Sequence, residues 1–262
     1  MTVLSRMFSD QRRRWLGFTI GISAVILIYL PLFESASQSG LLGAKLDALP
    51  DSLVEALNFT DVSNAAGYAQ ATIYGLIGML ILVAFAVGSG AWAIAGDEES
   101  GALELTMAHG VDRTNLLLQR ALALLTMTAV TTVIAGALVA VVSVASNLDL
   151  SANGITAATL ALGALGLFFG SIALLVGAVS GRRALALSIT GVVAVFAYLC
   201  NSILARTSAG GFFEAISPFH WAYGNDPLVN GVSLPGVGLL LGFSVAFVLV
   251  ALSLFDRRDV GV

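Results

Sequence analysis

Hydrophobic residues along the chain gather in six long runs that are separated by shorter polar segments. The runs cover about residues 15–33, 68–95, 116–146, 154–179, 184–204 and 234–255. A bilayer core about 30 Å thick requires about 20 apolar residues in a helix, and each run is about that long or longer. A helix also satisfies its own backbone hydrogen bonds, which the lipid interior cannot do. The pattern therefore predicts an all-α membrane protein, with six transmembrane helices in a single domain over residues 1–262.

The composition favours the same fold class. The chain is 58% hydrophobic and only 11% charged, whereas soluble domains carry roughly 25% charged residues. So few charged side chains cannot cover a surface that faces water. We therefore expect membrane lipid to surround most of the protein.

The basic residues are divided unequally between the two sides of the predicted membrane. The side that includes both termini carries Arg6, Arg12, Arg13, Arg14, Arg113, Arg120, Arg182, Arg183, Arg257 and Arg258, whereas the other side carries Lys45 and Arg206. Cytoplasmic loops are the ones that carry the excess of Lys and Arg. Both termini are thus predicted to be cytoplasmic, in a multi-pass protein of the cell inner (plasma) membrane.

Two long segments are predicted on the outer side. In residues 34–67, Ser52 and Glu55 have the spacing of a helix capping box, which predicts a short helix on the membrane surface. That helix would either gate the outer side or pack against neighbouring spans. Residues 205–233 are rich in aromatic side chains, which suits either a hairpin that dips into the outer leaflet or an anchor at the level of the headgroups.

The loop between the second and third runs has an unusual charge pattern. It begins with Asp97, Glu98 and Glu99 at the inner end of a span, where basic residues usually accumulate. Leu103 and Met107 follow, four residues apart, and form one apolar face of a short helix. By composition alone, the segment would also suit an ordinary solvated loop.

This loop resembles the inner loop of permeases in the type-2 export family of ABC transporters. In that family three acids are followed by Gly-Thr-Leu-Glu, then by Pro-Val-Ser-Arg and a later basic residue. The matching segments here are Asp97-Glu98-Glu99, Gly101-Ala102-Leu103-Glu104, Val111-Asp112-Arg113 and Arg120. The departures are Ala102 for threonine, Gly110 for proline, and His109 for a small or aromatic residue. None of them removes a charge of the motif.

A second resemblance lies on the outer side. The segments Ser217–Trp221 and Asp226–Gly231 are similar to the external loop of bacterial members of the same family. With the six spans, the resemblance covers the whole chain in outline.

The resemblance implies a short cytoplasmic coupling helix between spans two and three, which docks onto a separate ATPase subunit. The candidate residues that face this subunit or brace the loop are Asp97, Glu98, Glu99, Gly101, Glu104, His109 and Arg113. In that family the ATPase subunits bind ATP and magnesium. A second permease, identical or similar, completes the transport path.

The chain itself lacks the motifs of an ATP-hydrolysing enzyme. No Gly-x-x-x-x-Gly-Lys-Ser/Thr phosphate loop occurs, and the single lysine, Lys45, is predicted on the outer side. His109 and His220 lie in loops on opposite sides, and no acid lies in the middle of a run, so the sequence offers no metal site or proton-coupled site. We expect no catalysis, no cofactor in this chain and no nucleic-acid partner.

The third and fourth runs contain side chains that suit the wall of a transport path. The candidates are Thr128, Thr132, Phe168 and Phe169. A wall of small polar and apolar groups favours a lipophilic or amphiphilic cargo such as a drug, an antibiotic or a lipid-like molecule. Threonine hydroxyls in membrane helices also bond simply to the backbone, which is the alternative reading of the same residues.

These observations favour the permease subunit of an ATP-driven ABC exporter. The alternative is a non-transporting membrane scaffold or sensor, whose inner loop recruits a cytoplasmic partner.

Overall fold

The structure, a computed structural model, describes residues 3–38, 64–108, 112–202 and 210–258. Within these ranges every regular element is a helix, and six helical segments are long and apolar enough to cross a membrane. This confirms the predicted fold class. The six segments are α1 (Val3–Gln38), α4 (Ala65–Ala69) with α5 (Ile77–Ala93), α8 (Arg113–Ala145), α9 (Ala152–Ser180), α10 (Arg183–Ser202) and α14 (Leu234–Asp256).

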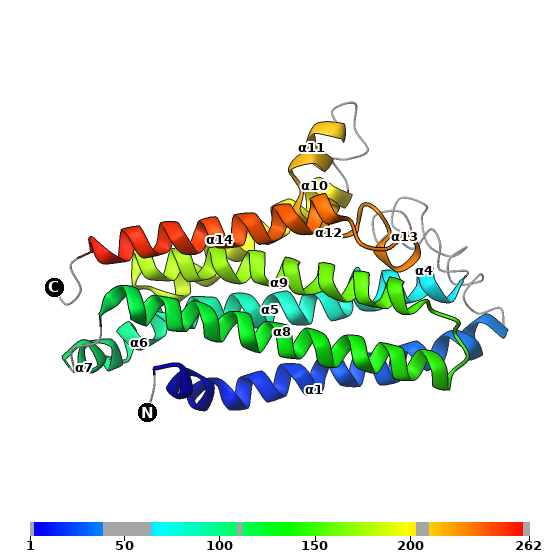
Figure 1. Ribbon diagram of the computed structural model, residues 1–262, viewed down its shortest axis with the longest axis horizontal. Coiled ribbons are helices and arrows are strands. Elements are labelled where there is room, and N and C mark those ends of the chain that lie inside the picture. Colours follow the sequence, from blue (N-terminus) through cyan, green and yellow to red (C-terminus); the bar gives the residue numbers. More distant parts are fainter. Residues whose placement is uncertain (1–2, 39–63, 109–111, 203–209, 259–262) are drawn as a thin grey trace.

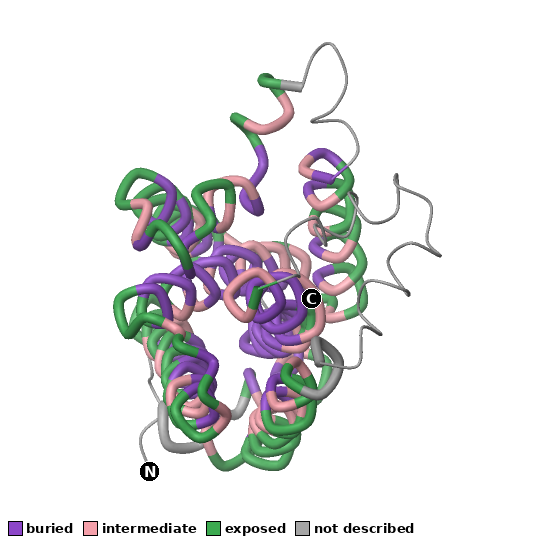
Figure 2. Tube along the Cα trace, turned by 90° about the vertical axis from the view of Figure 1, so that its right-hand side faces the viewer, coloured by how far each residue is buried: buried purple, intermediate pink, exposed green. Residues whose placement is uncertain are grey.

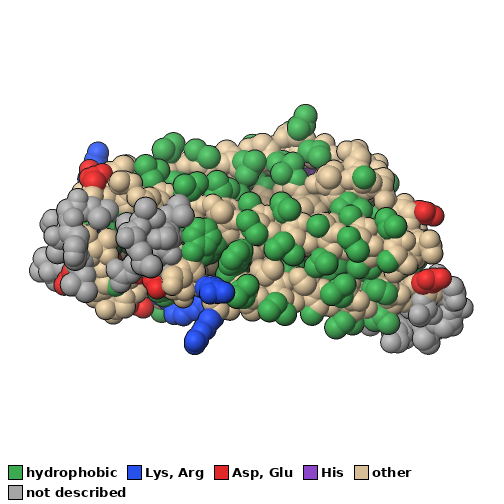
Figure 3. Space-filling view, turned by 60° about the horizontal axis from the view of Figure 1, so that its bottom comes forward, with side chains coloured by type: hydrophobic (Ala, Val, Ile, Leu, Met, Phe, Trp, Pro, Cys, Tyr) green, Lys and Arg blue, Asp and Glu red, His purple; other side chains and the backbone are tan. Residues whose placement is uncertain are grey.

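The six segments lie side by side along the long axis of the molecule (Figure 1). Helix α9 is central, because α5, α8, α10 and α14 all pack against it, while α1 packs against α8 and α5. Viewed along the bundle, the buried residues face the middle and the exposed residues face outward (Figure 2). Side chains that face outward are hydrophobic over a broad band, as expected where lipid is the solvent (Figure 3).

Helices α5 and α9 approach each other closely at a pair of glycines. A Cβ atom on Gly90 would collide with the carbonyl oxygen of Gly170 and lie 3.1 Å from the backbone nitrogen of Leu174. A Cβ atom on Gly170 would lie 3.2 Å from the carbonyl oxygen of Ala86. Small residues at such a contact let two membrane helices gain dispersion energy along their backbones.

The second span is interrupted near its N-terminal end. Between α4 and α5 the chain forms a π-helical turn, η1 (Gln70–Tyr74), which ends with a hydrogen bond of 2.7 Å from the Gly75 N–H to the Gln70 carbonyl. Leu76 then leaves the helical region, with φ −131° and ψ −86°. Irregular backbone at membrane depth is tolerated where protein buries it, and every residue of η1 is buried.

Between α10 and α14 the structure describes three short helices, of which α12 and α13 pack on the bundle. They are α11 (Gly210–Ile216), α12 (Pro218–Tyr223) and α13 (Pro227–Asn230). Helix α12 packs on α9 and α14 through aromatic rings: Phe219 lies 5.5 Å from Phe169, and Trp221 stacks on Phe243 at 5.6 Å. By contrast, Phe212 on α11 is 65% exposed. The aromatic side chains of this segment are therefore divided between the bundle and its surface.

The predicted short helix around Ser52 and Glu55 lies outside the described residues. The two ends of the described chain are placed together: the start of α1 and the end of α14 lie at the same end of the bundle as α6 (Ala95–Glu99) and α7 (Ala102–Ala108) (Figure 1). On the face shown in Figure 3, basic side chains gather toward this end, whereas acids lie at both ends. That this end is cytoplasmic stays a prediction from the count of basic residues.

The contact between α5 and α9 can be tested with two glycines of one helix. We expect Gly90→Ala to lower the free energy of unfolding by about 1–3 kcal/mol, because the added methyl group overlaps the backbone of α9. Gly88→Ala is the control, since a Cβ atom there meets nothing within 4 Å. Thermal unfolding of the detergent-solubilised protein measures both effects, and equal melting temperatures for the two variants would contradict the described contact.

Candidate coupling site at the charged end of the bundle

The segment from α5 through α7 turns twice at the end of the bundle that carries α6 and α7, which we call the charged end. Helix α6 begins after a bend at Ile94, and it ends where the N–H of Gly101 bonds to the carbonyl of Glu98 at 3.0 Å. Gly101 has φ +71°, in the left-handed region, where glycine costs less than other residues. This turn starts α7, so the glycine of the predicted motif is the residue that lets the chain reverse between the two short helices.

Asp97 makes the most buried of the acid contacts at this end. Its carboxylate pairs with the guanidinium of Arg120 on α8, through Oδ2 and Nη2. Only 4% of Asp97 and 1% of Arg120 is exposed. Because a charge of this kind is costly to bury alone, each side chain depends on the other, and the pair holds α6 against α8.

Glu98 forms a bidentate ion pair with Arg258, which lies just beyond the end of α14. The Glu98 carboxylate oxygens accept bonds from Nη2 at 2.5 Å and from Nη1 at 2.9 Å. The same Nη1 also donates to the carbonyl oxygen of Ala178 on α9, at 3.1 Å. The carbonyl oxygen of Arg258 accepts a bond of 2.5 Å from Nη1 of Arg113 on α8.

Glu99 bonds to a third helix. Its Oε1 accepts a hydrogen bond of 2.7 Å from the backbone N–H of Arg183, the first residue of α10. A carboxylate at a helix N-terminus satisfies a free donor and interacts favourably with the helix dipole. Although Glu99 is exposed, it therefore ties α6 to the start of α10.

The apolar face of α7 points into the bundle. Leu103 is buried in a cluster with Met7, Leu116 and Phe255, and Met107 packs against that cluster. The acid that follows Leu103 on α7, Glu104, is exposed. Of the predicted coupling residues, Glu104 is therefore the one on α7 that is available to a partner.

The remaining predicted coupling residues fall into two groups. Asp97, Glu98, Glu99 and Arg113 are brought together, and each bonds within this chain. His109 lies outside the described residues. The sequence predicts that these residues either face the partner or brace the loop. The three acids bond to other parts of this chain, and both roles stay predictions. Whether the loop couples to an ATPase stays a prediction.

Two partners in this network were missed by the search for motifs. The sequence identifies Arg183 and Arg258 only as two of the basic residues on the side that includes both termini. Both lie at the same end of the bundle as the three acids. Their shared position indicates that these basic residues could contact the three acids. The sequence does not show which acid contacts which residue.

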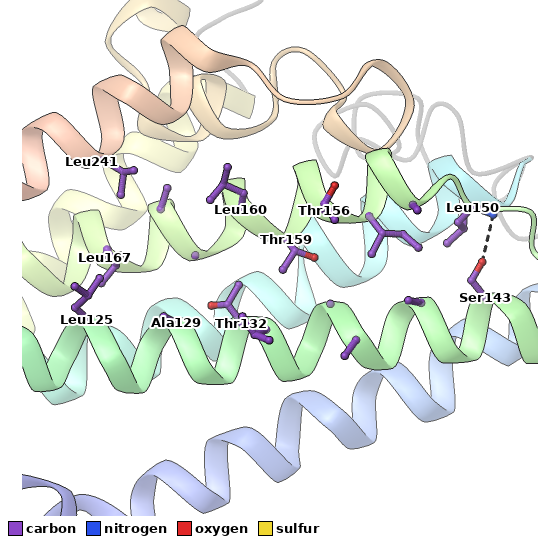
Figure 4. Close-up of a pocket in the computed structure, with 18 of the residues that line it drawn as sticks. Leu125, Ala129, Thr132, Ser143, Leu150, Thr156, Thr159, Leu160, Leu167 and Leu241 are labelled. Atoms are coloured by element: carbon purple, nitrogen blue, oxygen red, sulfur yellow. Dashed lines mark hydrogen bonds between the residues drawn. The ribbon is translucent and has the colours of Figure 1, made fainter.

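A cavity of about 750 Å³ opens on the side of the bundle between α8 and α9 (Figure 4). Threonines and glycines alternate across it: Thr132 packs on Gly163, and Thr159 packs on Gly136. At the end of the cavity that lies away from α6 and α7, the Ser143 hydroxyl oxygen accepts a bond of 3.2 Å from the N–H of Leu150. The other lining side chains are almost all aliphatic, so the cavity is apolar with a few hydroxyl groups.

A second cavity of about 500 Å³ adjoins the first one, between α8 and α14 and nearer the charged end. The two share Leu125, Leu167 and Leu241. Together they form one apolar groove that runs along α8 across most of the span.

Of the four predicted path residues, Thr132 lines the groove. Its hydroxyl donates to the carbonyl of Thr128 at 2.7 Å, which is the backbone bond that the sequence left open as the alternative. Thr128 is fully buried. Phe168 and Phe169 lie in the aromatic cluster around α12, in contact with Trp221 and Phe219 respectively, and line neither of these two cavities.

The comparison with protein-family models identifies the chain over nearly its whole length. Residues 1–260 match the model described as ABC-2 family transporter protein. The chain belongs to the ABC-2 transporter family. This confirms the resemblance seen in the inner loop, and it makes the protein a membrane permease subunit of an ABC transporter with multiple spans. Comparison with curated proteins gives no match.

The buried pair in this ABC-2 permease gives a test of the brace. We expect Arg120→Met to lower the free energy of unfolding by roughly 3–5 kcal/mol, because it leaves the Asp97 carboxylate buried without its partner. The double variant Asp97→Leu/Arg120→Met removes both charges and should cost less than Arg120→Met alone. Chemical unfolding in detergent micelles measures both, with Glu104→Ala as an exposed control. If Arg120→Met were no worse than Glu104→Ala, the pair would not support the fold.

Proposed function

We propose that this ABC-2 permease is the transmembrane subunit of an ATP-driven exporter in the cell inner membrane. Separate ATPase subunits would bind ATP and magnesium and dock at the end of the bundle that carries α6 and α7. The observation that carries this proposal is the bonding of α6, whose three acids contact α8, α10 and the end of α14. A force on α7 is thereby passed to the inner ends of several spans at once.

A stiff connection between α7 and the bundle would transmit such a force. Helix α7 is short, but its apolar face is packed in the bundle through Leu103, and α6 is joined to its neighbours by charged bonds. Bidentate charge-assisted hydrogen bonds fix the relative orientation of the two groups as well as the distance between them. When two ATPase subunits close around ATP, they would move the two docked loops, and the spans would follow as packed bodies.

A second permease, identical or similar, is part of the proposal. The groove along α8 opens at the surface of the bundle, since lining residues such as Ala129, Val133 and Val144 are exposed. A path through the membrane must be closed on all sides. Two copies or homologues would supply the missing wall.

The cargo is proposed from the chemistry of the groove. Its walls are aliphatic, and the hydroxyls of Thr132, Thr156 and Thr159 supply a few polar groups. Pockets of this composition bind apolar molecules and orient them with a small number of hydrogen bonds. We therefore expect a lipophilic or amphiphilic cargo.

Docking can be tested at the exposed acid of α7. We expect Glu104→Arg to reduce the amount of ATPase subunit retained by the purified permease about tenfold, because it reverses a charge on the exposed face of α7. Asp256→Arg is the matched control, since Asp256 is also an exposed acid at this end but lies on α14. Gentle extraction from the native membrane, followed by pull-down and an ATPase assay, gives the measurement.

Two results of this experiment would contradict the proposal. If wild-type protein retained no ATPase, the scaffold or sensor function would replace the exporter. If Glu104→Arg and Asp256→Arg lowered retention equally, docking would depend on the general charge of this end and not on α7.

Transport itself can be tested at the groove. We expect Ala129→Phe to slow the export of a lipophilic fluorescent dye several-fold from vesicles that contain the permease and its ATPase, because the ring fills the cavity. Val130→Phe is the control, because Val130 is exposed on the same helix but does not line the cavity. Export of sugar-like dyes alone, or equal rates for both variants, would be evidence against a lipophilic cargo in this groove.

A further inference from the structure

Arg258 contacts three separate segments at the charged end of the bundle. Its guanidinium bonds to Glu98 of α6 and to the Ala178 carbonyl of α9, and its own carbonyl accepts a bond from Arg113 of α8. Arg258 is the second residue after α14, whose last residues pack on the same cluster as α7. One residue near the C-terminal end of the chain therefore joins the coupling loop to the ends of three spans.

The Glu98–Arg258 ion pair fills a space in the bundle that a glycine leaves open. The turn between α9 and α10 passes beside it at Gly181, which has φ +63°. A Cβ atom on Gly181 would lie 2.6 Å from both carboxylate oxygens of Glu98 and would collide with Nη2 of Arg258. Only glycine combines this backbone conformation with enough space for the two charged groups.

The Glu98–Arg258 ion pair is largely shielded from solvent. The side chains of Arg258 and Glu98 are 24% and 22% exposed, and they meet in the two-pronged geometry that favours arginine over lysine. Arg257, the neighbour of Arg258, carries the same charge but is exposed. The two arginines thus differ in structure though not in charge.

We propose that Arg258 is a positioning residue for energy coupling, which transmits movement of α6 and α7 to the inner end of α14 through Glu98. This inference rests on the proposed function, because it requires an ATPase docked on the loop. Docking itself depends on the exposed face of α7 and does not require Arg258. Loss of the ion pair should therefore leave the ATPase bound but disconnect ATP binding from the movement of α14.

The experiment follows that movement directly. An environment-sensitive fluorophore is attached to Ser253→Cys, an exposed position in the last turns of α14, after the native cysteine is removed by Cys200→Ser. The complete permease–ATPase complex is reconstituted in lipid vesicles and given Mg-ATP with vanadate. We expect a fluorescence change in the parent protein and in Arg257→Ala, and a change about tenfold smaller in Arg258→Ala, with the amount of bound ATPase unchanged.

A charge swap separates positioning from folding. Glu98→Arg and Arg258→Glu each remove the attraction, whereas the double variant restores it with the charges exchanged. We expect the single variants to lose the fluorescence change and the double variant to recover most of it. A double variant without the change, folded or not, would overturn the inference.

The possible failures are distinguishable. If the parent protein binds ATPase and responds to ATP, and Arg258→Ala responds as strongly as Arg257→Ala, the role of Arg258 is wrong while the exporter function stands. If the parent protein retains no ATPase, the proposed function fails and the inference fails with it. If the parent protein retains ATPase but gives no fluorescence change, α14 does not move on ATP binding, and the inference alone fails.

Discussion

The close packing of α5 on α9 is the contact on which the other parts of this bundle depend. In lipid, apolar side chains gain little from leaving their solvent, so helices associate through backbone proximity and dispersion. Gly90 and Gly170 allow that proximity. Because α8, α10 and α14 also pack on α9, the position of α5 against α9 sets where the short helix α6 emerges from the bundle.

The contacts of the three acids at the charged end follow from this placement of α5 against α9. Helix α6 continues α5 and so begins close to the end of α9. It lies within reach of Arg120 on α8, the backbone N–H of Arg183 at the start of α10, and Arg258 just beyond α14. Three consecutive acids point in different directions from one turn of helix and find three different partners. Lone charges would be unfavourable at the boundary of the membrane, but here they become bonds between elements that are far apart in sequence.

Hydropathy predicted the spans well because lipid imposes one requirement on each of them, a run of apolar residues of sufficient length. It did not predict the interruption of the second span at η1, since a change in hydrogen-bond register leaves hydropathy unaltered. It also could not pair Glu98 with Arg258, which lies 160 residues away along the chain. That Phe168 and Phe169 line a path stays a prediction. Their ring contacts with α12 join residues far apart in the sequence, and no local pattern encodes such contacts.

The π-helical turn has a geometric consequence for the outer part of the second span. Such a turn holds one residue more than an α-helix would between the same ends, and one residue corresponds to a rotation of about 100° around the helix axis. The turn therefore sets the direction in which Tyr68 points. As the chain stands, the Tyr68 hydroxyl donates to the Tyr29 carbonyl at 3.2 Å, and its ring lies 5.3 Å from Phe33. A homologue with one residue fewer between Gln70 and Tyr74 would turn this face away from α1, and a different side chain would have to join the two spans there.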